Sequence, residues 1–282
     1  MRTPAAAKLA KTGFAVLHQP VDKVKKKALP LPSNPVAKLV AEANLAKSMT
    51  IDSITKAKPM KERLTDLPAF RTESPIKGML QAPLLSLADA AAAMIVCNQH
   101  DAKIAFDKGT EIASNDPHGL TADEAGSIVL YTMDTPVYTM LNRSLREADR
   151  EQLTPFLPYL KLMYNAYAKL PKFSGSVWRG VKKNLKKDYK FGAEIQWWSF
   201  SSTTKQLQTL TNPMFLGATG QRTIFLLETN CGVDIERFSA FASESEVLLF
   251  PGTKLRVAGQ MNMGGDLLQV HLQEVAETIA VQ

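Results

Sequence analysis

The strongest constraint in this sequence is a change in the spacing of its apolar residues, which occurs at Pro171. Between residues 85 and 170, apolar side chains recur every three to four positions, as they do along one face of a helix. Between residues 172 and 278, they alternate at every second position, and β-branched and aromatic residues dominate, as in strands. Helices followed by strands in a chain of this size predict an α+β fold in which both halves share one hydrophobic core.

The helical half contains its own start signals. Thr121 followed by Glu124 has the spacing of a capping box at the start of a helix. A long stretch that ends at Leu170 repeats Leu, Met and Tyr at helical spacing, and Pro155 and Pro158 fit its first turns or a bent start. We predict that these apolar stripes form core.

The second half contains short segments separated by Gly, Asn and Lys turns. Their alternation predicts six strands. The six segments read SVWRGV, EIQWWSFSS, RTIFLLET, EVLLF, KLRVAG and LLQVHLQEV.

Residues 1–75 differ in composition from the remainder of the chain. They hold 14 Lys and Arg against 6 Asp and Glu, which is +8, so residues 76–282 contribute about −1 to the net charge of +7. They also hold half of the 16 prolines, which break long helices and central strands. We predict a basic, partly disordered leader over 1–75 and a folded domain over 76–282.

The cationic leader could bind an acidic partner, a nucleic acid or a membrane surface. Phe14 and Phe70 are its only aromatic residues, so stacking on nucleic-acid bases is poorly supported. We predict a solvated leader that could bind an acidic partner, and no nucleic-acid binding by the folded domain.

The sequence lacks the patterns that are typical of membrane-spanning, disulfide-rich and metal-binding proteins. No apolar run approaches the roughly 18 residues of a membrane span, and Lys8 and Lys11 interrupt the stretch that would form a signal-peptide core. Cys97 and Cys231 are too few for a disulfide framework and lack metal-ligand spacing, and the four histidines form no metal set. We therefore expect no bound metal and a protein that works in a reducing compartment, or is delivered into one.

Three polar groups interrupt the strand half in places where a core strand would not favour them. Arg179 lies within the apolar segment SVWRG, where a guanidinium needs an anion: either a phosphate, which suits its bidentate geometry, or the carboxylate of a structural salt bridge. The segment WWSFSSTT at 197–204 has an apolar body and a hydroxyl-rich end. Glu244 and Glu246 lie two positions apart before VLLF, so in a strand their carboxylates would share a face.

Taken together and in this order, these segments resemble the signature of the arginine-directed mono-ADP-ribosyltransferases, which include vertebrate ecto-transferases and bacterial toxins. The resemblance covers roughly residues 85–278 and leaves the leader unexplained. One departure is Thr204, which stands where the family has a third-position serine. The matching residues are Arg179 in VWRGV, Ser202, Thr203 and Thr204 in FSSTT, and Glu244, Ser245 and Glu246 before VLLF.

The resemblance implies a fold and an activity. The fold is a helical N-terminal part packed on a mainly antiparallel, two-sheet β core. The activity is transfer of ADP-ribose from NAD+, the co-substrate, to an arginine of a target protein, with release of nicotinamide. An enzyme of this kind would be toxin-like, secreted or delivered into a host cell as an effector.

It also implies roles for individual residues. Glu246 would be the catalytic glutamate that holds the ribose, Ser202 would orient it, and Glu244 would position and deprotonate the acceptor guanidinium. Arg179 would grip the pyrophosphate of NAD+. Three further residues of the implied NAD+ site are Gly180, Thr203 and Phe215.

Two loops complete the implied site. Residues 205–221, which contain Phe215, correspond to a loop that folds over the nicotinamide and phosphates. Phe238 and Phe241 correspond to a loop that contacts target proteins. Glu at position 244 favours arginine as the acceptor, because relatives that modify other side chains usually carry Gln there.

Two other functions compete with this interpretation. An NAD+ glycohydrolase would use the same Arg, Ser and final Glu with water as the acceptor. An inactive transferase fold would serve only as a binding module, and the intact Arg, Ser and Glu positions count against it.

Overall fold

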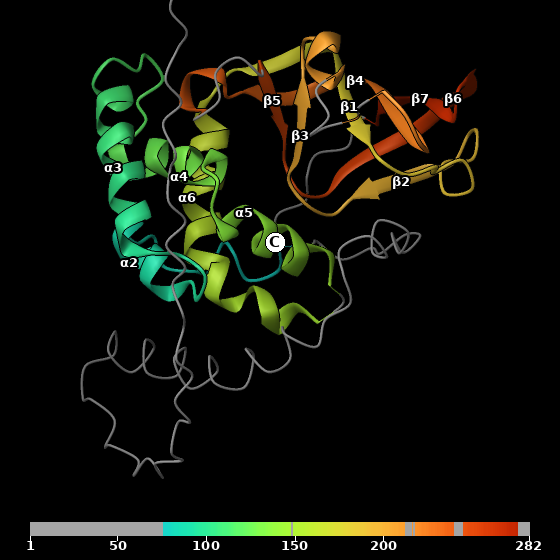
Figure 1. The fold of residues 1–282 in the computed structure, drawn as a ribbon. Helices are drawn as coiled ribbons and strands as arrows, with labels where there is room; N and C mark the ends of the chain where they lie inside the picture. The colour runs from blue at the N-terminus through green and yellow to red at the C-terminus, as the bar shows by residue number, and fades with distance from the viewer. Residues whose placement is uncertain (1–75, 148, 212–215, 217, 240–244, 276–282) are drawn as a thin grey trace, which may run out of the picture.

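The computed structural model describes residues 76–147, 149–211, 216, 218–239 and 245–275. Helices occupy one side of the molecule and strands the other, as Figure 1 shows. The α+β class predicted from the sequence is confirmed. The leader over 1–75 lies outside the described residues, so the division into leader and domain stays a prediction.

The helical side consists of five α-helices and a 3₁₀ segment in the described part of the chain. The capping box at Thr121 and Glu124 is present, with the two side chains and backbone N–H groups bonded reciprocally. The elements are α2 (Leu87–Ala93), α3 (Gln99–Ser114), α4 (Ala122–Thr132), α5 (Pro136–Arg146), η2 (Arg150–Phe156) and α6 (Leu157–Lys169).

The long helical stretch predicted up to Leu170 is divided at its prolines. Pro155 lies inside the 3₁₀ segment η2, and Pro158 occupies the first turn of α6, where a missing N–H costs no hydrogen bond. The bent start expected from these prolines is therefore a change of helix type.

Seven strands form the other side of the molecule. Their order is β1-β3-β5-β4-β7-β6-β2, and β1 also pairs with β4. All pairs are antiparallel except β4 with β7. The strands are β1 (Lys172–Val181), β2 (Glu194–Trp197), β3 (Ser201–Thr204), β4 (Arg222–Asp234), β5 (Glu246–Leu249), β6 (Thr253–Gly264) and β7 (Leu267–Glu274).

The strands are connected differently from the expectation in two respects. Hydrogen bonds join all seven into one network, because the 13-residue β4 pairs with β7 along its first half and with β5 at its end. The predicted single strand EIQWWSFSS is two strands, β2 and β3, which pair with different partners. The chain leaves β2 at Trp198, which is buried, and Ser199 accepts a hydrogen bond from Arg146 of α5.

Strand β5 lies between two hydrophobic clusters. Leu248 packs with the helices, whereas Val247 and Leu249 pack with residues of β1, β4, β6 and β7. Burial on both faces explains why its sequence is continuously apolar instead of alternating. The prediction of one core shared by both halves was wrong, because the strands enclose a second core of their own.

Helices α3 and α4 cross in close contact at two glycines. A Cβ atom at Gly109 would lie 2.5 Å from the carbonyl oxygen of Ala122 and 2.7 Å from the Cα of Gly126. Because both are backbone atoms, no side chain can move aside to make room.

We therefore expect Gly109→Ala to lower the free energy of unfolding by about 2 kcal/mol, as overpacking does. Denaturant unfolding followed by circular dichroism measures it. Gly259→Ala is the matched control, since a Cβ there has no atom within 4 Å. If Gly109→Ala had the same free energy of unfolding as Gly259→Ala, α3 and α4 could move apart to accommodate the added Cβ without loss of stability.

Candidate active site

Glu246 is the first residue of β5, and its side chain is only 8% exposed. Side chains two apart in a strand share a face, so Glu246 points to the same side as Leu248, toward the helices. Its carbonyl oxygen accepts a hydrogen bond from the backbone N–H of Ile235 at 3.0 Å. In the ladder, Thr204 of β3 stands opposite Glu246 and Ser202 stands opposite Leu248. Ser202 and Glu246 therefore belong to adjacent pairs on one face of β3 and β5.

Tyr131, at the end of α4, links the helices to this face. Its hydroxyl is hydrogen-bonded to Ser202 and accepts a hydrogen bond from Asn142 of α5 at 3.1 Å. Burial raises the pKa of Tyr131 to about 12, and the negative charge of Glu246 adds to the shift, while the hydrogen bond from Asn142 opposes it. The phenol is thus a neutral group between the serine and the helices at physiological pH.

Arg179 of β1 is half-buried beside these residues. Its Nη1 donates a hydrogen bond to the carbonyl oxygen of Ser202 at 2.8 Å, and its guanidinium lies 5.8 Å from the ring centre of Trp197. Burial lowers the pKa of Arg179, and Coulomb interactions with the phenols of Tyr131 and Tyr189 and with Glu246 oppose that effect.

The structural salt bridge considered for Arg179 is not seen. Among the described residues, no carboxylate lies within ion-pair distance of its guanidinium. Its other N–H groups have no protein acceptor in the same part of the chain. A partly desolvated cation with unused donors is suited to bind an anion in a bidentate manner.

Two other predicted NAD+-site residues have structural contacts. The hydroxyl of Thr203 donates to the carbonyl oxygen of Val247 at 2.6 Å, on the face opposite Ser202. At Gly180, a Cβ atom would lie 2.9 Å from the Cβ of Leu216. Packing against Leu216 is thus one reason for a glycine at position 180, and the NAD+-binding roles of Thr203 and Gly180 stay predictions.

The residue between the two glutamates is not extended. Ser245 has φ of 46°, in the left-handed region, and β5 begins only after it. The argument that Glu244 and Glu246 share a strand face therefore fails, because period two requires extended backbone between them. Glu244 itself lies outside the described residues.

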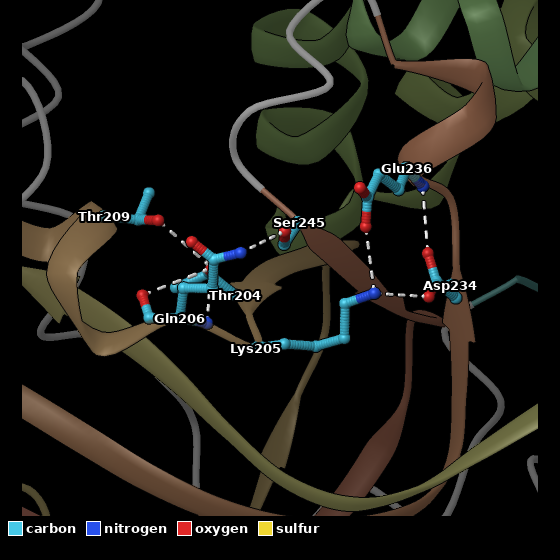
Figure 2. A network of polar contacts seen from close by, with 7 residues as sticks. All are labelled: Thr204, Lys205, Gln206, Thr209, Asp234, Glu236 and Ser245. Atoms are coloured by element: carbon cyan, nitrogen blue, oxygen red, sulfur yellow. Dashed lines mark hydrogen bonds and ion pairs between the residues drawn. The ribbon is translucent and has the colours of Figure 1, made fainter.

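Ser245 is held by the segment that follows β3. Its carbonyl oxygen accepts from the backbone N–H of Lys205 at 3.1 Å, and its hydroxyl accepts from Nε2 of Gln206 at 2.9 Å. Figure 2 shows this contact together with the ion pairs of Lys205 to Asp234 and Glu236. The left-handed conformation costs a residue with a Cβ about 1 kcal/mol, which these bonds offset.

The predicted loops are placed only in part. In residues 205–221, Leu210 and Leu216 are buried against Ile224, so both ends of this loop are anchored. Phe215 and Phe241 lie outside the described residues. Phe238 is 1% exposed within the helical core. The ring of Phe238 therefore presents almost no surface to a target protein, and the role of the loop in target contact stays a prediction.

The structure adds residues that the sequence did not single out. Tyr131 and Asn142 belong to helical apolar segments, and only their shared position behind Ser202 distinguishes them. Within the described ranges, no cluster of three or more His, Cys, Asp or Glu could hold a metal ion. No helix in the same ranges combines the length and the apolar character that crossing a membrane requires.

The model of the family NAD:arginine ADP-ribosyltransferase matches residues 81–280. The NAD(P)(+)–arginine ADP-ribosyltransferase 1 of Gallus gallus is 26% identical over 165 residues, which are 55% of this chain and 50% of that protein. This chain thus spans about half the length of that relative.

Two solved structures are similar in fold. The type III effector XopAI from Xanthomonas axonopodis pv. citri has a TM-score of 0.53 at 17% identity, over 80% of this chain and 100% of that one. The eukaryotic mono-ADP-ribosyltransferase ART2.2, in complex with NADH, has a TM-score of 0.52 at 20% identity, over 71% and 89%. At these identities, both matches support the fold alone.

The raised pKa of Tyr131 predicts how stability depends on alkaline pH. An acid whose pKa is higher in the folded state than in the unfolded state stabilises the fold below its unfolded value, near 10. That contribution is lost as the pH rises toward 12. In Tyr131→Phe this loss is absent, so its stability deficit relative to wild type should shrink by about 1 kcal/mol between pH 9 and pH 11.

Denaturant unfolding at both pH values measures this difference. Tyr138→Phe is the control, because it removes a hydroxyl from an exposed neighbour of the same ring cluster. A constant difference between Tyr131→Phe and wild type at the two pH values would show that Tyr131 is not kept neutral by its burial.

Proposed function

Because the chain belongs to the NAD:arginine ADP-ribosyltransferase family, we propose that it transfers ADP-ribose from NAD+ to arginine side chains of a target protein and releases nicotinamide. One observation supports this most directly. The buried carboxylate of Glu246 and the hydroxyl of Ser202 lie on one face of paired strands, and Arg179 is bonded to the backbone of Ser202. The three residues of the sequence motif therefore come from three strands and lie within one site.

Arg179 is suited to the pyrophosphate of NAD+. Its guanidinium is half-buried, pairs with no carboxylate in the described part of the chain and has unused donors. It lies 5.8 Å from the ring centre of Trp197, whose Nε1 donates a hydrogen bond to the hydroxyl of Tyr189 at 3.1 Å. A fixed guanidinium in a partly dry setting binds a phosphate pair more tightly than a mobile lysine would.

Glu246 is suited to stabilise the reacting ribose. Nicotinamide in NAD+ is already a cationic leaving group, so breaking its glycosidic bond requires no general acid. The bond electrons leave with nicotinamide, and the ribose takes on oxocarbenium character, the problem that glycosidases also meet. A buried carboxylate that binds the ribose 2′-hydroxyl places negative charge beside the developing cation, where it is most effective.

Glu244 would then serve the acceptor. Arginine is a poor nucleophile because its guanidinium is protonated at all physiological pH values. A carboxylate that accepts a guanidinium proton as the new C–N bond forms to the ribose would remove this obstacle. The name of the curated relative from Gallus gallus, an arginine ADP-ribosyltransferase, supports arginine as the acceptor.

We also propose that the target is a protein reached after delivery of the enzyme. The similar structure of XopAI is described as a type III effector, and the basic leader over 1–75 would suit a delivery or targeting segment. Incubation with labelled NAD+ and a whole-cell lysate, followed by mass spectrometry of the labelled proteins, identifies the target and the modified side chain together.

Glu246→Gln should abolish both ADP-ribose transfer and NAD+ hydrolysis. It keeps the size of the side chain and removes the charge, and loss of one such electrostatic group typically costs on the order of 10²–10³ in rate. Nicotinamide release measures the effect, with the circular dichroism spectrum as the control for folding. Near-normal transfer by a folded Glu246→Gln variant would refute the assignment.

Glu244→Gln should separate the two activities. Cleavage of NAD+ requires only the ribose contact, whereas transfer also requires activation of the guanidinium. We expect modification of agmatine, a small guanidine acceptor, to fall by at least about tenfold, while nicotinamide release without acceptor stays within about twofold of wild type.

Two other outcomes have distinct meanings. A parallel fall of both rates would mean that Glu244 acts through NAD+ binding or folding. Wild-type hydrolysis with no transfer to any guanidine, in the unmodified enzyme, would favour the NAD+ glycohydrolase instead.

A further inference from the structure

The left-handed conformation of Ser245 lies directly before the proposed catalytic glutamate. Ser245 is 5% exposed and has φ of 46°, which is uncommon for a residue with a Cβ. Such a conformation persists only where surrounding contacts enforce it. The direction in which the chain enters β5, and with it the position of Glu246, depends on those contacts.

Two consecutive residues supply them. The backbone N–H of Lys205 donates to the carbonyl oxygen of Ser245, and the side chain of Gln206 donates to its hydroxyl at 2.9 Å. Gln206 is itself fixed, because its backbone N–H donates to Oγ1 of Thr204 at 3.1 Å. Thr204 stands opposite Glu246 in the β3–β5 ladder, so the contacts close a short loop around the start of β5.

The side chain of Lys205 binds the segment around Ile235, which is hydrogen-bonded to the backbone of Glu246. Its Nζ lies 2.6 Å from Oδ2 of Asp234 and 3.0 Å from Oε2 of Glu236. These two acids flank Ile235, whose N–H donates to the carbonyl oxygen of Glu246. Figure 2 shows both sets of contacts meeting at the end of β3.

We infer that Gln206 is a positioning residue for Glu246, acting through its hydrogen bond to Ser245. This inference rests on the proposed function. Gln206 is exposed and contributes no side chain to any hydrophobic cluster among the described residues, so its loss leaves the core intact. The segment that follows Ser202 in the chain thereby fixes Glu246, which lies on the same face of the β3–β5 ladder as Ser202.

Gln206→Ala tests this role. Loss of one neutral hydrogen bond should lower kcat for nicotinamide release about fivefold, because Glu246 spends less time in the productive geometry. KM for NAD+ should change less than twofold, and the melting temperature should stay within about 2 °C of wild type. The matched control is Gln99→Ala, at an exposed glutamine of α3 outside the proposed site, which should keep wild-type kcat.

A double-mutant cycle identifies the partner. Ser245→Ala removes the accepting hydroxyl and keeps the Cβ, so it should lower kcat to the same extent as Gln206→Ala. The double variant should be no slower than either single variant, because each removes the same bond. The inference would be overturned if the two substitutions lowered kcat multiplicatively in the double variant. It would also be overturned if Gln206→Ala lowered the melting temperature and left kcat unchanged.

Glu246→Gln separates failure of the inference from failure of the proposed function. If wild type releases nicotinamide, Glu246→Gln does not, and Gln206→Ala equals wild type, the function stands and the positioning role falls. If Glu246→Gln is as active as wild type, Glu246 is not the catalytic group, and both fall.

Discussion

The pairing of β5 with β3 and β4 is the constraint on which the rest of this structure depends. β5 is only four residues long, yet it is buried on both faces, by the helices on one side and by the strand core on the other. Packing on two faces fixes its position more firmly than its own few hydrogen bonds could. Glu246 is the first residue of β5, so its backbone is held in place with the strand, although its side chain belongs to neither hydrophobic cluster.

The fixed position of β5 holds the carboxylate of Glu246 beside groups that compensate its charge, although apolar residues surround it. A buried charge is costly unless neighbouring groups compensate it. Here Glu246 interacts favourably with the cation of Arg179 from β1, and the neutral phenol of Tyr131 from α4 lies near both groups. The site is thus assembled where the helical half meets the strand half, and neither half contains it alone.

The sequence was sufficient for the parts of the site that local pattern determines. The change of period at Pro171 predicted the order of helices and strands, and the capping box at Thr121 predicted the start of α4. Polar groups in apolar strand segments drew attention to the regions of Arg179, Ser202 and Glu246, and the resemblance to the arginine-directed mono-ADP-ribosyltransferases selected these three residues. The structure brings these three residues into one site, as contacts through the Ser202 backbone and the β3–β5 ladder show.

What the sequence could not provide depends on contacts between distant segments. Tyr131 resembles any other residue of an apolar helical stripe, and its hydrogen bond to Ser202 exists only after α4 has packed behind β3. Two cores were mistaken for one, because VLLF has the same sequence whether one face or both are covered. The glutamate pair was expected on one strand face because a period-two argument assumes extended backbone, and nothing in Glu-Ser-Glu signals a left-handed serine.

The arrangement of Arg179 and Glu246 completes the physical account of the site. Opposite charges in a partly dry site would be expected to pair directly, and a buried pair broken by a ligand would lose its Coulomb energy at each binding event. Instead, Arg179 donates to the carbonyl oxygen of Ser202 and forms no ion pair in the described part of the chain. Its orientation is fixed by a neutral acceptor. In the proposed function, a pyrophosphate would bind Arg179 without displacing a carboxylate of the described part of the chain, and Glu246 would act on the ribose. Strand β3 lies between β1 and β5, so Arg179 and Glu246 are one strand apart, an arrangement consistent with the proposal that each acts on a different part of NAD+.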